Sequence, residues 1–564
     1  MENLIISISI IIGIAALFTI IAKLIRQPPI IAYLIAGLIV GPIFLNLINQ
    51  SNSQFIEMFA KLGIALLLFI VGLNLDFRVL KEFGKVSVLA GISEILIMSS
   101  IGFAISLAYG FSYTPALYLA AAFAFSSTVV VVKILSDKKE MDTLHGKIAL
   151  GILIVEDFVA ALILMLIPIL HNSGSGVILL SIGKIVGLII GVFLLSTFIV
   201  NKATHYLARS QETLFLFGIA WALIISSAFY FSGLSLEIGA LIAGMALASS
   251  KYHIELGSKI KPLRDFFVVL LFVYFGSKLT GNITLIIIYE TLAFSCLILI
   301  GKPLIIMSLM KLLGYKKRTN FLTGSSLAQL SEFSLIIILV GFSYGHLSQD
   351  LMNVAILTSL ITIAISSYSI HYSHTIFNKI SNLLNIFEGK KEGIESSANK
   401  LENYEIILFG YHRIGFKILE KLKKMNKKVV VIDYNPKVIL SLSEKGINCI
   451  YGDASDPGFL SEIKLGKAKL VISTIPDENA NISIKRMLKE MDSKAIFIAT
   501  AEQPREAVEL YNNEIDYVIV PHHLGGDYIS NIIEKFGTNK DLYDKLGKTH
   551  KKSLNSAKEE SNFN

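Results

Sequence analysis

Apolar stretches long enough to cross a lipid bilayer recur from Leu4 to about Tyr372 and then stop. A bilayer core of about 30 Å needs about 20 apolar residues in a helix, so this recurrence predicts a polytopic α-helical membrane domain of about 13 spans. The expected spans are approximately Leu4–Ala22, Ile30–Leu47, Phe55–Leu73, Val86–Tyr109, Ala116–Leu135, Ile148–Leu170, Val177–Val200, Leu214–Phe231, Leu236–Ser249, Phe266–Leu279, Leu285–Met310, Phe321–Tyr344 and Met352–Tyr372.

Lys and Arg fall almost entirely in alternate loops between these spans. One set of loops holds 19 of them, and the other holds only Lys61 and Lys278. Loops rich in Lys and Arg stay in the cytoplasm, so the asymmetry predicts a multi-pass protein of the cell membrane, with the N-terminus outside and everything after Tyr372 in the cytoplasm. The net charge of +8 is thereby explained without a nucleic-acid partner.

The apolar part of the chain repeats itself. Leu34–Val40 in the second span resembles Leu241–Leu247 in the ninth, and Leu67–Gly72 in the third resembles Leu270–Gly276 in the tenth. Both pairs are seven spans apart, so the two copies enter the membrane in opposite directions. This pattern predicts an inverted-topology repeat, which is common in secondary transporters; chance recurrence of apolar strings is the alternative.

Some ionisable residues lie deep inside expected spans. Glu156 and Asp157 are adjacent in the sixth span, and Lys302 lies in the eleventh. A charge at the centre of a spanning helix costs about 2.5–3.5 kcal/mol on insertion scales, so each needs a reason. Two nearby carboxylates can exchange protons, and Lys302 is the natural partner of one of them. A purely structural ion pair, or a lysine that reaches the interface, is the alternative.

Small polar residues interrupt the fifth and twelfth spans, at Phe125–Val129 and Gly324–Phe333. Such clusters let a helix unwind and expose backbone carbonyls to an ion, although they also serve ordinary helix packing. Glu332 in the second cluster is a further intramembrane carboxylate. The chain has no Thr-Val-Gly-Tyr-Gly filter, which argues against a potassium-channel pore.

Several of these motifs together resemble the Kef-type transporters of the monovalent cation:proton antiporter-2 family. The motifs are Arg26-Gln-Pro-Pro29, Ala36-Gly37, Gly41-Pro42, Ser126-Ser-Thr128, Glu156-Asp157 and Ala328-Gln329 followed by Glu332-Phe333. The resemblance covers about residues 1–375. It implies a sodium/proton-antiporter-like fold, with crossed and broken helices at the ion site and a dimerisation domain.

The resemblance also assigns roles to residues. Asp157 would be the essential ion- and proton-binding carboxylate, Ser127 and Thr128 would lie on one crossing helix, and Glu332 on the other. Lys302 matches the lysine that neutralises the first acid in electrogenic relatives. Kef-type efflux systems usually have Gln where this chain has Glu156, so their electrical properties and their glutathione gating do not transfer directly. We expect electrogenic exchange.

After a charged, serine-containing linker, the pattern changes to short apolar runs that alternate with amphipathic helices. The expected strands are about Glu405–Phe409, Val429–Ile432, Cys449–Tyr451, Leu470–Ser473, Ala495–Ala499 and Tyr517–Val520. This alternation predicts a parallel, doubly wound Rossmann-like sheet. The expected domains are residues 1–375 in the membrane, a linker at 376–403, the α/β domain at 404–535 and a loose polar tail at 536–564.

A glycine turn follows the first of these strands. Gly410 and Gly415 frame it, and Asp433 ends the second strand, as in a dinucleotide fingerprint. His412 occupies the position of the central glycine, so AMP, ATP and NAD(H) all stay open as the adenine nucleotide. A domain that only dimerises is the alternative. The candidate nucleotide-binding residues are Gly410, Tyr411, His412, Arg413, Ile414, Gly415, Asp433, Tyr434, Asp453, Ala454 and Thr474.

This region resembles the N-terminal half of the RCK (TrkA-N) regulatory domain, through Gly452-Asp-Ala454 and Ser473-Thr-Ile-Pro476. We expect no second, ligand-binding half of the RCK domain. We also expect no enzymatic activity, since a dehydrogenase would need a separate substrate domain where a hydride is transferred, and no such domain is expected. The sequence thus predicts a homodimeric K⁺ or Na⁺:proton antiporter of the lipid bilayer, regulated by a nucleotide. A ligand-gated potassium efflux channel and a membrane-tethered nucleotide sensor are the rival functions.

Overall fold

The chain has two compact units, each described here by itself. One unit comprises Met1–Met141, His145–Leu313 and Lys317–Gly389, and the other comprises Asp142–Leu144, Gly314–Lys316 and Lys390–Asn564. The computed structural model describes residues 2–48, 53–74, 77–138, 140–141, 143–172, 178–197, 210–232, 236–248, 250, 252–281, 283–389, 404–411, 414–454, 459–460, 463 and 465–560.

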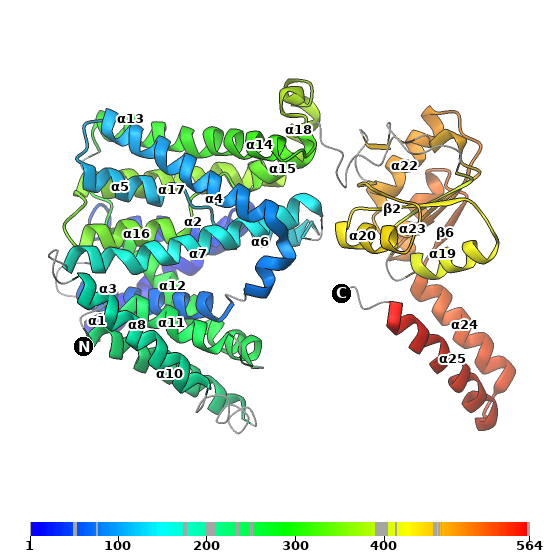
Figure 1. Ribbon diagram of the computed structural model, residues 1–564, viewed down its shortest axis with the longest axis horizontal. Helices are drawn as coiled ribbons and strands as arrows, with labels where there is room; N and C mark the ends of the chain where they lie inside the picture. The colour runs from blue at the N-terminus through cyan, green and yellow to red at the C-terminus, as the bar shows by residue number, and fades with distance from the viewer. Residues whose placement is uncertain are drawn as a thin grey trace. The chain divides into compact units, whose positions relative to one another are not determined.

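The first unit, the membrane unit, is built of apolar helices that lie alongside one another (Figure 1). Its helices are α1 (Glu2–Leu24), α2 (Pro29–Val40), α3 (Ser53–Asn74), α4 (Phe77–Ala108), α5 (Tyr113–Ala122), α6 (Thr128–Asp137), α7 (Leu144–Asn172), α8 (Ile178–Leu195), α10 (Gln211–Phe231), α11 (Leu236–Leu247), α12 (His253–Ser277), α13 (Leu285–Cys296), α14 (Lys302–Leu312), α15 (Lys317–Ser326), α16 (Glu332–Ser343), α17 (Gln349–His371) and α18 (Ser373–Ile380). Within the described residues, 7 helices are long and apolar enough to cross a membrane, and the shorter apolar helices include α2, α11 and α16.

Two of the expected spans are each broken into two helices. The fifth span divides into α5 and α6, and the twelfth divides into α15 and α16. The breaks fall at the small polar clusters, where Ser127 and Ser331 cap the helices that follow: each hydroxyl accepts a backbone N–H. Serine favours this position because its side chain satisfies an N–H that has no partner within the helix. The expected unwinding at both clusters is thus confirmed.

Paired glycines allow the two copies of the repeat to cross closely. A β-carbon on Gly37 in α2 would lie 3.0 Å from the Cα of Gly276 in α12. A β-carbon on Gly244 in α11 would lie 2.9 Å from the Cα of Gly72 in α3. Exchanging the second span with the ninth and the third with the tenth converts one crossing into the other, as an inverted repeat requires.

The second unit, the α/β unit, contains a six-stranded parallel sheet of order β3-β2-β1-β4-β5-β6. The strands are β1 (Ile406–Phe409), β2 (Val429–Asp433), β3 (Cys449–Tyr451), β4 (Leu470–Ser473), β5 (Ile496–Thr500) and β6 (Tyr517–Ile519). Each lies within one residue of its expected bounds. Side chains of α19 (Gly415–Lys424) and α20 (Pro436–Glu444) form one apolar cluster with the sheet, and those of α22 (Glu478–Glu490) and α23 (Pro504–Asn512) form the other. Both faces of the sheet are therefore covered, as in other doubly wound domains.

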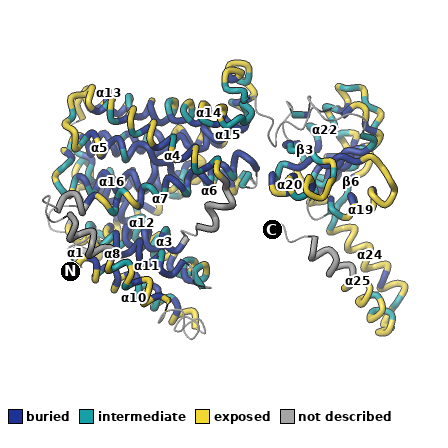
Figure 2. Tube along the Cα trace, viewed as in Figure 1, coloured by how far each residue is buried: buried dark blue, intermediate teal, exposed yellow. Residues whose placement is uncertain are grey.

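The end of the chain corrects one expectation. The segment from Lys540 was expected to be loose, but it forms the helix α25 (Lys540–Glu560) after α24 (Pro521–Phe536). The rings of Phe536 and Tyr543 pack 5.6 Å apart where the two helices meet. Figure 2 shows exposed residues along most of α24. The polar composition concealed a helical period, since Leu542 and Leu546 are four residues apart.

Candidate functional site

The two broken spans of the membrane unit meet at their breaks. The backbone N–H of Ser331 donates to the carbonyl oxygen of Phe125 over 3.0 Å. The Ser126 hydroxyl donates to the carbonyl oxygen of Leu327 over 2.9 Å. Each break therefore satisfies backbone groups of the other, which is what allows irregular backbone inside a membrane protein.

Asp157 lies beside this crossing and is partly exposed. The hydroxyl of Thr128, the first residue of α6, donates to Asp157 Oδ2 over 2.9 Å. The Ser127 hydroxyl donates to Glu332 Oε2 over 3.0 Å. The crossing thus brings together two of the three predicted carboxylates, Asp157 and Glu332, with both predicted hydroxyl groups. All four supply oxygen atoms, the ligands that hard cations prefer.

Glu156, the neighbour of Asp157, is fully buried and points into a different set of contacts. Its Oε2 accepts the backbone N–H of Ser126 at 2.5 Å, and its Oε1 accepts the Ser126 hydroxyl at 3.2 Å. The Lys302 ammonium lies 3.3 Å from Glu156 Oε1. Adjacent residues on a helix point about 100° apart, so one helix presents one carboxylate to the accessible side and one to the sealed side.

Lys302 itself has no exposed side-chain surface, so it does not reach a membrane interface. Its ammonium donates to the carbonyl oxygen of Ala124, just beyond the last residue of α5, over 2.5 Å. A π-helical turn at Leu297–Gly301 immediately precedes Lys302. Such turns interrupt regular helical bonding and are frequent at functional sites. The expected pairing of Lys302 with an acid of the sixth span is confirmed.

The helix ends at the crossing match the charges placed on them. The ends of α5 and α15 carry partial negative charge, and the starts of α6 and α16 carry partial positive charge. Lys302 contacts the negative end of α5, and Glu332 is the first residue of α16. Each side chain therefore has the sign that its helix end favours.

Sequence reasoning missed Glu94, a fourth carboxylate of this site. Glu94 lies in α4, is fully buried, and has its Oε1 atom 3.2 Å from the Lys302 ammonium. Lys302 therefore stands between two carboxylates that come from different helices. Glu156 was identified as an ionisable residue deep inside an expected span. The same criterion would have identified Glu94, because Glu94 lies eight residues inside the fourth expected span.

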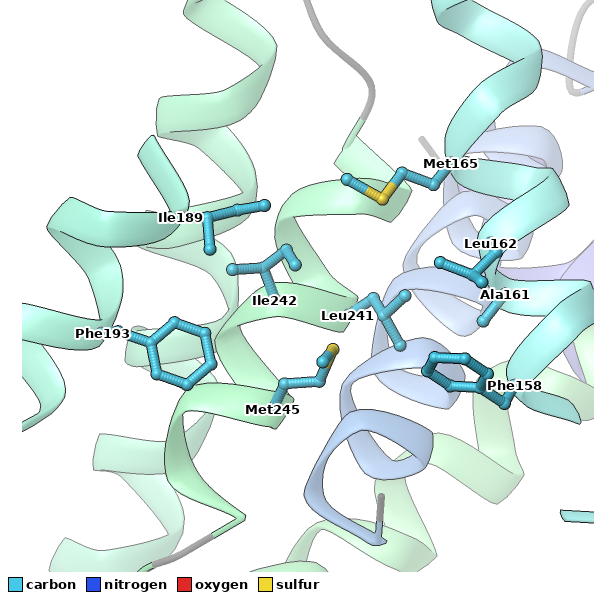
Figure 3. Close-up of a pocket in the computed structure, with 9 residues that line it drawn as sticks. All are labelled: Phe158, Ala161, Leu162, Met165, Ile189, Phe193, Leu241, Ile242 and Met245. Carbon is cyan, nitrogen blue, oxygen red and sulfur yellow. The ribbon is translucent and has the colours of Figure 1, made fainter. Parts of the chain in front are cut away.

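A cavity of about 240 Å³ lies next to the acidic pair, between α7, α8 and α11 (Figure 3). Phe158 and Leu162 of α7 point toward Leu241 and Met245 of α11 across it. The lining side chains are all apolar. Across this cavity, the helix that carries Asp157 thus faces α11 through apolar side chains.

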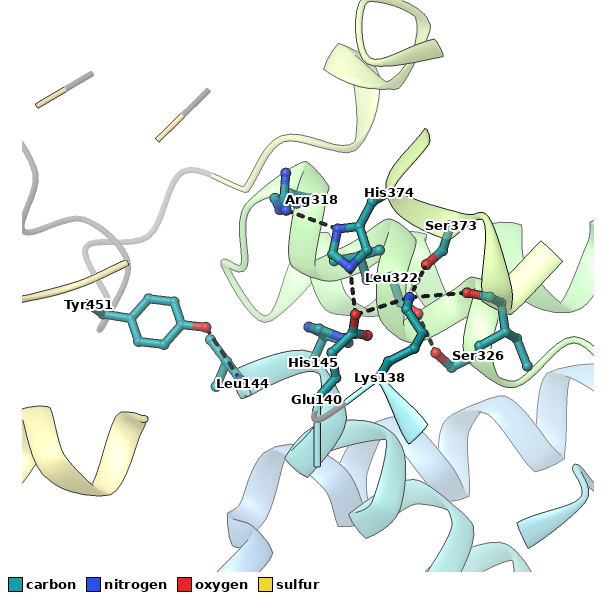
Figure 4. Close-up of polar contacts among 11 residues, drawn as sticks. Lys138, Glu140, Leu144, His145, Arg318, Leu322, Ser326, Ser373, His374 and Tyr451 are labelled. Atoms are coloured by element: carbon teal, nitrogen blue, oxygen red, sulfur yellow. Dashed lines mark hydrogen bonds and ion pairs between the residues drawn. The ribbon is translucent and has the colours of Figure 1, made fainter. Parts of the chain in front are cut away.

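A second ionic cluster, the Glu140 cluster, joins the far ends of the helices that build the site (Figure 4). Glu140, in the loop after α6, accepts from Lys138 at 3.0 Å, from His374 at 2.8 Å and from His145 at 3.2 Å. Burial raises the pKa of Glu140, but the hydrogen bonds from His145 and His374 and the charge of Lys138 outweigh it, so the pKa is held below its usual range.

Arg318 of α15 extends the Glu140 cluster by fixing the tautomer of a histidine. Its guanidinium lies 3.0 Å from His374 Nδ1. A guanidinium has no acceptor atom, so His374 Nδ1 must accept and its Nε2–H must donate to Glu140. Glu140 follows α6 and Arg318 belongs to α15, so the two broken spans are linked through His374 and the Glu140 carboxylate.

In the α/β unit, the glycine turn after β1 has the form that a phosphate cradle needs. Gly410 has a φ of +84°, a conformation that favours glycine. A β-carbon on Gly415 would lie 3.0 Å from the carbonyl carbon of Gly410 and would collide with its oxygen. Glycine at both positions therefore lets the start of α19 approach the end of β1, where its N–H groups suit an anion.

Asp433 is engaged by the backbone around it. Its Oδ2 accepts the N–H of Tyr411 at 2.9 Å, and its Oδ1 accepts the N–H of Asn435 at 2.8 Å. An ionised carboxylate offers only acceptor atoms, which is the chemistry that a ribose hydroxyl needs from its partner. The Thr474 hydroxyl donates to the carbonyl oxygen of Gly410 over 3.1 Å and braces the turn.

The remaining predicted nucleotide-binding residues fall near this turn or outside the described part of the chain. His412 and Arg413 lie outside the described residues. Ile414 ends the turn just before α19, and Tyr434 follows Asp433. Asp453 is partly buried and Ala454 is buried, both after β3. The residues that follow the carboxyl ends of β3, β2, β1 and β4 thus lie along the same end of the parallel sheet.

Comparison with known proteins agrees with this geometry. The family model described as sodium/hydrogen exchanger, transmembrane, matches residues 11–372, and the TrkA-N domain model matches residues 406–521. The chain is 27% identical over 476 residues to the putative cation/proton antiporter YbaL of Escherichia coli K12, covering 81% of this chain and 84% of that protein. It is also 27% identical over 513 residues to the glutathione-regulated potassium-efflux system protein KefC of Escherichia coli O139:H28, covering 88% and 80%.

A crystal structure of the TrkA-N domain of YbaL from Escherichia coli is 22% identical, with a TM-score of 0.23, and covers 24% of this chain and 99% of that one. The membrane match extends over more than half of this chain, and the breaks, the crossing and the acidic pair lie within it. The chain is therefore a multi-pass membrane protein that belongs to the sodium/hydrogen exchanger family and carries a cytoplasmic TrkA-N domain.

Proposed function

We propose that this protein exchanges a monovalent cation, K⁺ or Na⁺, for protons across the cell membrane. Asp157 binds the cation and protons in turn. Membership of the exchanger family and the antiporter relatives support exchange. The observation that carries the assignment to Asp157 is the division of the acidic pair: Glu156 is sealed against Lys302, whereas Asp157 is partly exposed beside Thr128.

The other residues of the crossing have supporting roles in this proposal. Thr128 and Ser127 present hydroxyl oxygens to the cation, and Glu332 adds negative charge at the start of α16. Glu156 and Lys302 adjust the charge around Asp157. The excess of Lys and Arg in alternate loops supports an external N-terminus. The working unit is a homodimer, as the resemblance to Kef-type transporters implies.

Replacing Asp157 with Asn tests the assignment. The variant retains the shape and the Thr128 contact but cannot gain and lose charge, so cation-dependent proton movement in proteoliposomes should vanish. Asp137→Asn, at the exposed end of α6, is the matched control and should leave exchange unchanged. Substantial exchange by a folded Asp157→Asn variant would overturn the assignment. Parallel assays with K⁺ and Na⁺ would identify the cation.

The alternative function is a potassium efflux channel, and the same proteoliposome assay distinguishes a channel from an antiporter. A channel would pass K⁺ down its gradient without moving protons in the opposite direction. An antiporter acidifies or alkalinises the vesicle lumen in proportion to the cation that it moves. Cation flux without a matching proton flux would favour the channel.

We also propose that an adenine nucleotide binds the turn at Gly410–Gly415 and regulates transport. The close approach of α19 to β1 and the acid at the end of β2 support this role. His412 replaces the central glycine, so NAD(H), AMP and ATP are all tested. Calorimetry on the full chain should detect binding of one of them, and Asp433→Ala should weaken it. Absence of binding by all of them would leave a dimerising role.

A further inference from the structure

Glu94 is a buried carboxylate that the exchange scheme above does not use. Its Oε1 lies 3.2 Å from the Lys302 ammonium, nearly the same distance as the 3.3 Å that separates the ammonium from Glu156 Oε1. Neither oxygen of Glu94 accepts a hydrogen bond within the part of the chain that the structure describes. Glu156, by contrast, accepts two hydrogen bonds from Ser126.

The three side chains form a group whose charges do not balance. Glu94, Glu156 and Lys302 each have 0% exposed side-chain surface. Two carboxylates and one ammonium would leave a net negative charge without water around it, which is strongly unfavourable. Helix α4 packs against α5 and α14, and the charged groups that face Glu94 are Lys302 of α14 and Glu156 of α7. One proton held by the group restores neutrality.

The hydrogen bonds indicate which carboxylate holds that proton. The backbone N–H of Ser126 can only donate, so it favours an ionised Glu156. Glu94 has no such donor besides the ammonium. The resting arrangement is therefore a neutral Glu94, an ionised Glu156 and a charged Lys302.

We propose that Glu94 is the alternate counter-ion of Lys302, which takes over the ammonium when a cation draws Glu156 toward Asp157. At that moment the O–H bond of Glu94 breaks and its proton leaves to water through the accessible side at Asp157, while the new carboxylate pairs with Lys302. Lys302 keeps its own proton throughout. Cation binding then displaces one proton from Asp157 and one from Glu94, so two protons exchange for one cation and the cycle is electrogenic.

This inference rests on the proposed exchange at Asp157. Counting the protons released on cation binding tests the role of Glu94 separately from that exchange. Protons released per cation bound are measured on the full-length detergent-solubilised protein, by calorimetry with KCl or NaCl in buffers of different ionisation enthalpy. We expect about two protons for the wild type and about one for Glu94→Gln. Glu290→Gln, a buried carboxylate of α13 outside the site, is the matched control and should stay at about two.

Each outcome decides a different point. A wild type that releases no protons contradicts the exchange at Asp157. A wild type that releases two, with an unchanged Glu94→Gln, contradicts the role of Glu94 alone. A folded Glu94→Gln that binds no cation also contradicts it, since Asp157 should still bind. In proteoliposomes, exchange by the wild type should respond to an imposed membrane potential, because a 2:1 cycle moves one net charge, whereas 1:1 exchange by Glu94→Gln is electroneutral and should not respond.

Glu94→Asp covers the case in which Glu94→Gln does not fold. It retains a carboxylic acid, so the proton count should remain about two. The infrared band of the protonated carboxyl group that disappears on cation binding should shift in frequency relative to the wild type. An unshifted band would show that the proton comes from another group.

Discussion

The two ionic clusters of the membrane unit balance charge in opposite ways. Around Lys302, one cation serves two carboxylates and no side chain is exposed. Around Glu140, one carboxylate receives a lysine and two histidines, and its side chain is 14% exposed. In the sealed cluster, no water can replace a missing partner. In the Glu140 cluster, several donors and some water share the task, so the loss of any one partner should matter less.

The largest expected effect follows the removal of Lys302. Lys302→Met leaves the buried Glu156 carboxylate without its cation, and breaking a buried pair in this way typically costs about 3–5 kcal/mol. The thermal unfolding midpoint of the detergent-solubilised protein should fall accordingly. Adding Glu156→Gln to Lys302→Met should recover part of the loss, because the carboxylate left without a counter-ion is removed. A double variant less stable than Lys302→Met would contradict this view of the sealed cluster.

Glu140→Gln should have an intermediate effect that depends on pH. The carboxylate accepts three charge-assisted or imidazole hydrogen bonds, so we expect a loss of about 1–3 kcal/mol at pH 7. Because the pKa of Glu140 is lowered in the folded protein, its contribution is complete above about pH 4.3, the ordinary value for glutamate, and declines as the pH falls below it.

Thermal unfolding midpoints of the wild type and Glu140→Gln, measured from pH 7 to pH 3, test the direction of this pH dependence. The two curves should be separated at pH 7 and converge at low pH. Glu388→Gln, which removes a carboxylate that accepts from the backbone of Lys317, controls for a general loss of charge. Curves that diverge as the pH falls would contradict a lowered pKa.

The smallest expected effect belongs to Lys138→Met, and salt should reduce it further. Lys138 is one of three donors to Glu140 and its side chain is 16% exposed, so we expect a loss of about 0.5–1 kcal/mol. Raising the salt concentration from 0.1 M to 1 M shortens the screening length from about 10 Å to about 3 Å. The penalty of Lys138→Met should shrink, whereas that of Lys302→Met should not. Equal salt dependence would remove the distinction between the clusters.

Local chemistry allowed much of this architecture to be predicted. Apolar strands bounded by turns gave the sheet within one residue, and serine clusters gave the breaks between α5 and α6 and between α15 and α16. The pairing of Lys302 with Glu156 followed from depth in the membrane. These predictions succeed because each depends on neighbouring residues and on the need to satisfy polar groups in an apolar medium.

The contact of Glu94 with Lys302 could be found only from packing between distant segments. Glu94 and Lys302 are separated by 208 positions, and nothing local shows that α4 lies against α14. The helix α25 was missed because composition alone was considered, without the spacing of its apolar residues.

The glycine crossings have a consequence for how the chain is assembled in the membrane. Gly37 meets Gly276 and Gly72 meets Gly244, so each contact joins residues that are 239 or 172 positions apart. At about 5–20 residues per second, the ribosome needs about 12–48 s to synthesise the longer interval. Until then, α2 and α3 have inserted without the partners that bury their glycine faces. Their early association must therefore be loose enough for α11 and α12 to displace, which makes the first third of the chain the part most exposed to misassembly and membrane proteases.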